Sequence, residues 1–171
     1  HSMDIDPDHH EDRVLYIRHG LDRSLVKSYV SSLQIGLRSM GDYGSVIMYG
    51  REDAPNVIHR AIVWLDCNKD GTWSCEELSR YSGDWSCTGG TDYRSLSGVL
   101  TFKDITLSHK EVFVDLDALK KKSGFLTMGD NPSSNRYFDQ SAGLIDYPVG
   151  QSDIIGYVVS DGKEYYYPRP Q

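Results

Sequence analysis

Short apolar runs separated by turn-forming residues characterise this chain. The runs RVLYIRHG (13–20), SVIMYG (45–50) and NVIHRAIVWL (56–65) contain the β-branched and aromatic residues that favour strands. Because only a short polar turn separates the second run from the third, these two are predicted to pair as a β-hairpin.

The second half of the chain has the same character. Residues 99–116 alternate in part between apolar and polar positions, and residues 124–130 form an apolar run that leads into a turn. Residues 153–160 and 164–168 flank an Asp-Gly pair, which is typical of a closing hairpin.

Helical patterns are few. Residues 21–35 repeat apolar positions at helical spacing but are rich in Ser and β-branched residues, which leaves both helix and strand open. Residues 117–124 predict a helical turn, and residues 131–152 an irregular loop. The pattern predicts one mostly-β domain over residues 1–171, a barrel or a sandwich with short helices, and a polar Gly/Ser-rich insertion at 66–98.

Composition narrows the function classes. The chain has 171 residues, 39% of them hydrophobic, which is enough to build a core. Its formal net charge of −7 disfavours nucleic acid as a partner, because phosphates would be repelled. No apolar run approaches the roughly 20 residues that span a bilayer, and the acidic N-terminal stretch has no signal-peptide pattern.

The three cysteines, Cys67, Cys75 and Cys87, all fall in the predicted insertion. Three thiols cannot all pair within one chain, so one disulfide with a free thiol and three free thiols are both open. The short loop between Cys75 and Cys87 makes them the favoured pair, which would indicate an oxidising compartment.

Residues 66–77, DCNKDGTWSCEE, match the spacing of a calcium-binding loop. Short oxygen side chains stand at alternate positions, Gly71 permits a sharp turn, and a carboxylate occupies the twelfth position. A strand run precedes the loop where an EF-hand has a helix. The predicted structural Ca²⁺ site comprises Asp66, Asn68, Asp70, Thr72 and Glu77.

Several segments in order resemble the type I signal peptidases of archaea and the endoplasmic reticulum. They are GDYGSVIMY (41–49), NVIHRAI (56–62), GFLTMGDNPSSNRYFDQ (124–140) and DIIGYVV (153–159). In that family a strand carries a His-Arg pair, a later strand ends in Lys-Gly-Asp-Asn, and a second Asp follows in a loop. Met128 stands here where the family has Lys.

The resemblance implies a signal-peptidase-like β fold and a serine endopeptidase that removes signal peptides from exported preproteins. It also implies membrane attachment through an anchor that this chain lacks, with the catalytic domain on the extracytoplasmic face. The substrates would be preproteins with small residues before the cleavage site, bound as an added β-strand. No cofactor is expected for catalysis.

The family nucleophile is a Ser followed by Met, and the chain contains two such pairs. Ser2 precedes the first strand run, where the family places the nucleophile, and is the first choice. Ser39 runs almost directly into the 41–49 segment and is the second.

By family position, His59 is the general base, Asp139 its carboxylate partner, and Asp130 a second acidic group that orders the site. A serine hydroxyl needs such a base to become nucleophilic, and a carboxylate on the far ring nitrogen fixes the histidine tautomer. Two alternatives remain open: a catalytically inactive, calcium-stabilised β module that binds peptides or partner proteins, and a peptidase of the same fold with another task, such as self-cleavage of a regulator.

Overall fold

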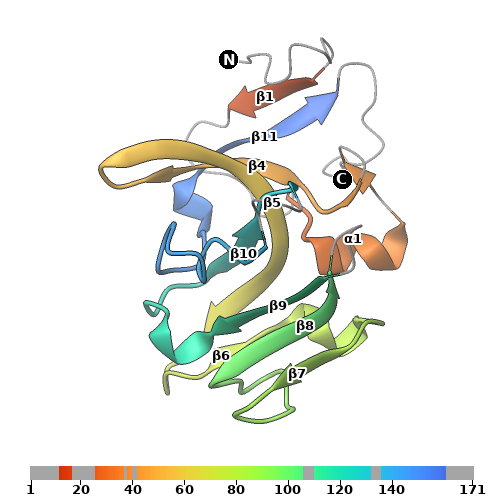
Figure 1. The fold of residues 1–171 in the computed structure, drawn as a ribbon, viewed down its shortest axis with the longest axis vertical. Coiled ribbons are helices and arrows are strands. Elements are labelled where there is room, and N and C mark those ends of the chain that lie inside the picture. Colours follow the sequence, from red (N-terminus) through yellow and green to blue (C-terminus); the bar gives the residue numbers. More distant parts are fainter. Residues whose placement is uncertain are drawn as a thin grey trace.

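The computed structural model describes residues 12–16, 26–36, 38–39, 42–105, 110–131 and 136–160. The chain is mostly β, as predicted, and its strands form antiparallel sheets (Figure 1). The described strands do not close into a barrel. Of the two predicted architectures, barrel and sandwich, the barrel is therefore wrong.

The main sheet has the order β1-β11-β4-β5-β10, with β6 paired to the far end of β5. Its strands are β1 (Asp12–Tyr16), β4 (Val46–Arg51), β5 (Ala54–Cys67), β6 (Trp73–Ser74), β10 (Gly124–Met128) and β11 (Ile154–Ser160). Strand β5 is the longest, and Figure 1 shows it curving from the upper strands towards the second sheet. The predicted hairpin of 45–50 with 56–65 is confirmed as β4 and β5.

The second sheet has the order β7-β8-β9 and lies at the other end of β5 (Figure 1). Its strands are β7 (Trp85–Cys87), β8 (Val99–Ile105) and β9 (Lys110–Asp115), and a two-stranded sheet joins β2 (Arg38–Ser39) to β3 (Asp42–Tyr43). The short 3-10 helices are η2 (Glu76–Arg80), η3 (Leu116–Ala118) and η4 (Gln151–Asp153). The helical turn predicted at 117–124 is therefore limited to η3.

One α-helix, α1 (Tyr29–Ile35), forms within the ambiguous segment 21–35. The Ser28 hydroxyl caps its first turn by accepting a hydrogen bond from Ser31 N–H at 3.0 Å, and Gly36 ends it in the left-handed conformation. Of residues 21–35, positions 21–25 lie outside the described residues. These caps explain why helix prevails over the β-branched content at residues 29–35.

The predicted insertion 66–98 contributes to the core of the molecule. Trp73, Leu96 and Cys75 are fully buried there, and they pack with side chains from the main sheet, the second sheet and α1. Although this segment is polar overall, its few apolar side chains pack into the core and attach the segment to the rest of the molecule.

All three cysteines are free thiols, so the favoured Cys75–Cys87 disulfide is wrong and the alternative of three thiols holds. Cys75 lies between β6 and η2, whereas Cys87 ends β7 and directs its thiol to the Ser97 carbonyl. Burial raises the pKa of the Cys75 thiol well above its usual value, which keeps it protonated and unreactive.

Strand β11 confirms the run at 153–160, but it pairs with β1 and β4. Its predicted hairpin partner, 164–168, lies outside the described residues.

Candidate active site

His59 and Asp139 form a hydrogen-bonded pair, although 80 positions separate them in the chain. The ring Nδ1 lies 2.8 Å from Asp139 Oδ1 and 2.9 Å from Oδ2. His59 is carried by β5, and Asp139 by the segment that follows β10. The structure thus brings together the two residues to which the family resemblance assigns the roles of base and carboxylate partner.

Two hydroxyl groups also bind the Asp139 carboxylate. Tyr49 on β4 donates to Oδ2 at 2.8 Å, and Thr127 on β10 donates to the same oxygen at 2.6 Å. The three strands β4, β5 and β10 are neighbours, so each supplies one donor to the carboxylate. Asp139 is only 3% exposed, and its own N–H donates to Thr127 O, which fixes the backbone as well.

The environment of Asp139 determines which ring nitrogen of His59 is free. A carboxylate only accepts hydrogen bonds, so Nδ1 must carry the proton that faces it. In the neutral ring, Nε2 then has the lone pair, and it has no partner among the described residues. His59 is 21% exposed at its side chain, so Nε2 is available as a proton acceptor.

Asp130 takes a different role from Asp139. It forms a bidentate ion pair with Arg60, with Nε to Oδ1 at 2.9 Å and Nη2 to Oδ2 at 2.6 Å. Arg60 follows His59 in β5 and therefore points to the opposite face of the sheet. Asp130 thus acts on the far side of the sheet from the histidine.

Arg60 also holds the chain ahead of β4. Its Nη1 donates to Ser39 O at 2.6 Å and to Gly44 O at 2.7 Å. Gly44 has a φ of 89°, and a Cβ there would lie 2.6 Å from Ala61 O, so only glycine fits. The guanidinium therefore holds the backbone of Ser39 and of residues 42–44 on its own face of the sheet.

This arrangement separates Ser39 from His59. The Ser39 hydroxyl is buried, with no hydrogen-bond partner among the described residues, and its carbonyl is bound by Arg60. The structure therefore does not bring Ser39 to the histidine.

Ser2 lies outside the described residues. The sheet register nevertheless gives the distance that separates β1, the first strand after Ser2, from His59 on β5. His59, Ile47, Tyr157 and Leu15 form one row across β5, β4, β11 and β1. Three strand spacings of about 4.8 Å place β1 roughly 14 Å from β5. Ten residues connect Ser2 to the start of β1 and can extend to at most about 35 Å. The chain is long enough for Ser2 to reach His59.

Sequence reasoning missed Tyr49 and Thr127. The available signal was one polar residue within a run that is otherwise apolar: Thr127 is the fourth residue of GFLTM, a strand buried at every position. A buried hydroxyl needs a hydrogen-bond partner, and here that partner is Asp139.

The structure does not gather the predicted calcium ligands around one point. Asp66 Oδ1 accepts from the Trp64 indole at 2.8 Å, whereas Asp70 Oδ1 accepts from Thr72 N–H at 2.9 Å and from its hydroxyl at 2.6 Å. Residues 66–67 pair with 73–74 as the β5–β6 hairpin. Across the described residues, no group of three or more His, Cys, Asp or Glu side chains is arranged to hold a metal ion.

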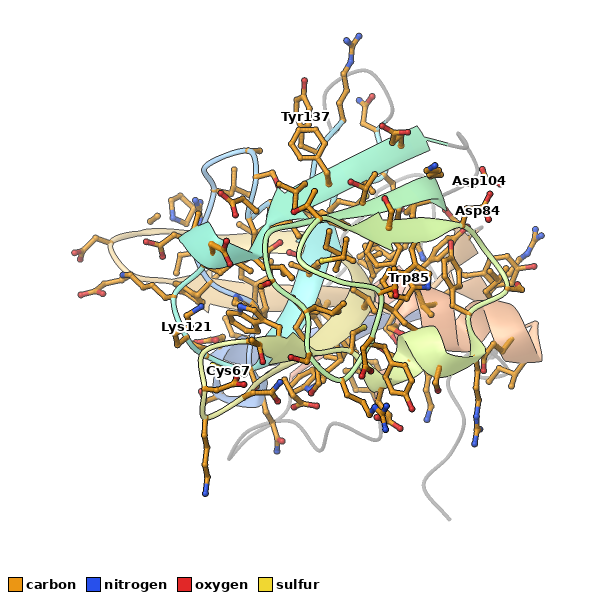
Figure 2. The ribbon with its side chains drawn as sticks, turned by 90° about the horizontal axis from the view of Figure 1, so that it is seen from below. Cys67, Asp84, Trp85, Asp104, Lys121 and Tyr137 are labelled. Atoms are coloured by element: carbon orange, nitrogen blue, oxygen red, sulfur yellow. The ribbon has the colours of Figure 1, made fainter. Side chains whose placement is uncertain are left out.

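Two further contacts occupy the same loop. Lys121, visible near Cys67 in Figure 2, donates from Nζ to Gly71 O at 2.9 Å. Asn68 donates to the Thr72 hydroxyl and to Arg94 O, each at 3.0 Å. The Lys121 ammonium group thus binds the Gly71 carbonyl at the turn of this loop. The calcium site stays a prediction.

Glu77 has a structural role that the sequence did not indicate. Its Oε1 accepts from Trp64 N–H at 2.7 Å, and its Oε2 accepts from the Ser28 hydroxyl. The Glu77 carboxylate therefore accepts a backbone hydrogen bond of β5 that a neighbouring strand would otherwise accept. It also links β5 to Ser28 at the start of α1.

We expect Glu77→Ala to lower the free energy of unfolding by about 1–3 kcal/mol, because it leaves Trp64 N–H without its acceptor. Urea denaturation measures this, and the exposed neighbour variant Glu76→Ala should stay within about 0.5 kcal/mol of the parent. Calcium binding is measured separately, by the melting temperature with added calcium and with chelator. A rise with calcium that Asp66→Ala abolishes would establish the predicted calcium site, and an unchanged melting temperature in both proteins would exclude it.

Of the described helices, none has the length and apolar character that a membrane crossing requires. No protein-family model, curated protein or solved structure matches the chain.

Proposed function

We propose that this protein is a serine endopeptidase of the signal peptidase I type, with a signal-peptidase-like fold, attached to a membrane and acting on its extracytoplasmic side. One observation supports the proposal above all: the His59–Asp139 hydrogen bond joins the two residues that stand at the base and carboxylate positions of family motifs far apart in the sequence. The paired Arg60 and Asp130, from the same two motifs, support it.

The reaction follows from the free Nε2 of His59. The Ser2 hydroxyl oxygen attacks the scissile carbonyl carbon while its proton moves to Nε2. The imidazolium then gives that proton to the leaving amine, and the peptide C–N bond breaks to leave an acyl ester on Ser2. Water, deprotonated by the same nitrogen, hydrolyses the ester and restores the serine. Asp139 stabilises the imidazolium in both halves.

Strand addition is the proposed mode of substrate binding, and the described edges limit where it can occur. The outer edge of β10 is filled: Phe125 pairs with Val149 in both directions, while Thr127 binds Asp139 N–H and the Gln140 side chain. The other edge of the main sheet is β1, with no further strand beside it among the described residues. The β1 edge is thus the edge of the main sheet that an extended peptide can still join, and because β1 lies three strand spacings from β5, only a part of the substrate away from the scissile bond would pair there.

A preprotein cleavage assay tests the proposal. The full-length protein in membranes should cut a preprotein after a small residue, at a site located by mass spectrometry of the products. A matched substrate with Leu in place of the small residues before the cut should be processed at least ten times more slowly. Equal processing of both substrates, or no processing of either, would contradict the proposal.

A further inference from the structure

We propose that Tyr49 and Thr127 are positioning residues: their two hydroxyls hold the Asp139 carboxylate ionised and oriented so that His59 presents Nε2 as the base. This inference rests on the proposed function only for its kinetic consequences. The juxtaposition itself consists of three donors, from three neighbouring strands, on one buried carboxylate.

Burial makes these hydroxyls necessary. An ionised carboxylate removed from water is costly unless hydrogen bonds replace the lost hydration. With Asp139 only 3% exposed, the imidazole N–H alone would leave most of its acceptor capacity unused. Hydrogen bonds to a charged group are also stronger than neutral ones, so the two hydroxyls favour the ionised form.

Tyr49 is suited to be a permanent donor. Its side chain is completely buried, and burial, followed by the charge of Asp139, raises the pKa of its phenol. The phenol therefore stays protonated over the working range of an enzyme and keeps its O–H available to donate to Asp139. A tyrosine is also long enough to reach Asp139 from β4, across the strand that carries His59.

Thr127 binds Asp139 twice. Its hydroxyl donates to Oδ2, and its carbonyl accepts from Asp139 N–H at 2.7 Å. The carboxylate is thus fixed relative to β10 by both backbone and side chain, which sets the direction from which it meets the His59 ring. The buried neighbours of Asp139, Phe138 and Gln140, hold the same segment against the core.

The pH dependence of activity follows from the negative charge of Asp139 beside the His59 ring. The hydroxyls disperse the negative charge of Asp139, so losing one makes the carboxylate a stronger partner for a protonated ring. The midpoint of the acid limb should therefore move to higher pH. Other ionisable groups near this network are Arg51 at the end of β4, which acts on Tyr49, and Tyr157 on β11, in the row that contains His59.

The test compares Tyr49→Phe and Thr127→Val with two controls. Thr127→Ser retains the hydroxyl, and Tyr147→Phe removes the phenol of a half-buried tyrosine from the same segment as Asp139. Each positioning variant should lower kcat about 3- to 30-fold with KM nearly unchanged, and raise the acid-limb midpoint of kcat/KM by roughly half a pH unit. Thr127→Ser and Tyr147→Phe should match the parent.

A second measurement does not depend on peptidase activity. ¹⁵N NMR of the histidine rings, with His59 assigned by the His59→Gln variant, should show an Nδ1-protonated ring whose titration midpoint rises in Tyr49→Phe and in Thr127→Val. If the midpoint shifts while the parent cleaves nothing, the positioning role stands and the proposed function fails. If the parent cleaves preprotein while both variants keep its pH profile and NMR titration, the positioning role is overturned.

Discussion

Replacing His59 with Ala should reduce preprotein cleavage by about 10⁴-fold or more, because the reaction then has no group to accept the nucleophile's proton. The same protein should remain folded. The side chain is partly exposed, and its hydrogen bond is to a carboxylate that keeps Tyr49 and Thr127 as donors. The measurement is single-turnover cleavage of a preprotein by the full-length protein in membranes, with thermal melting of each variant.

Asn56→Ala is the matched control for this variant, because Asn56 is exposed on the same strand, β5. It should cleave at the parental rate. Asp139→Asn extends the test: the amide can still contact the ring but cannot stabilise an imidazolium, so a loss of about 10³-fold or more is expected. Asp146→Asn, an exposed site later in the same segment, should be neutral. Parental cleavage by His59→Ala would eliminate the proposed peptidase.

The hairpin and the dyad were predictable because their signals are local or motif-based. Strand β5 is a dense run of β-branched and apolar residues next to a short turn, so the hairpin needed no knowledge of the rest of the molecule. Asp139 alone had no sequence signal. It was selected from its place in the family pattern, and its contact with His59 depends on packing across the main sheet.

Residues 66–77 show what a sequence pattern leaves undetermined. Residues 66–77 have the spacing of a calcium loop, but a spacing does not determine which partner each oxygen takes. The hairpin of β5 with β6 directs Asp66 towards the Trp64 indole, and Glu77 towards β5 and α1. Backbone pairing thus orients these carboxylates, and it depends on contacts outside the motif.

A sequence motif also does not specify which face of a sheet each of its side chains occupies. The adjacent residues His59 and Arg60 read as one motif, yet the pleat of β5 sends them to opposite sides. One side holds Asp139 with its hydroxyl donors, and the other holds Asp130 and the backbone of Ser39. The adjacent pair therefore supplies one face with the proposed catalytic histidine and the other with an arginine that binds Asp130 and the backbone of Ser39.

This division of faces leads to the second large effect. Ser2→Ala should abolish cleavage to the same extent as His59→Ala, whereas Ser39→Ala should cleave at a rate within a few fold of the parent, because Ser39 belongs to the Arg60 face. Ser39→Ala is a matched control, since both variants remove one hydroxyl from a Ser-Met pair. The two variants should be compared in the same membrane assay, with mass spectrometry of the acyl intermediate trapped at low temperature. Full activity of Ser2→Ala would place the nucleophile elsewhere, and an acylated Ser39 would identify Ser39 as the nucleophile and require it to leave Arg60 during turnover.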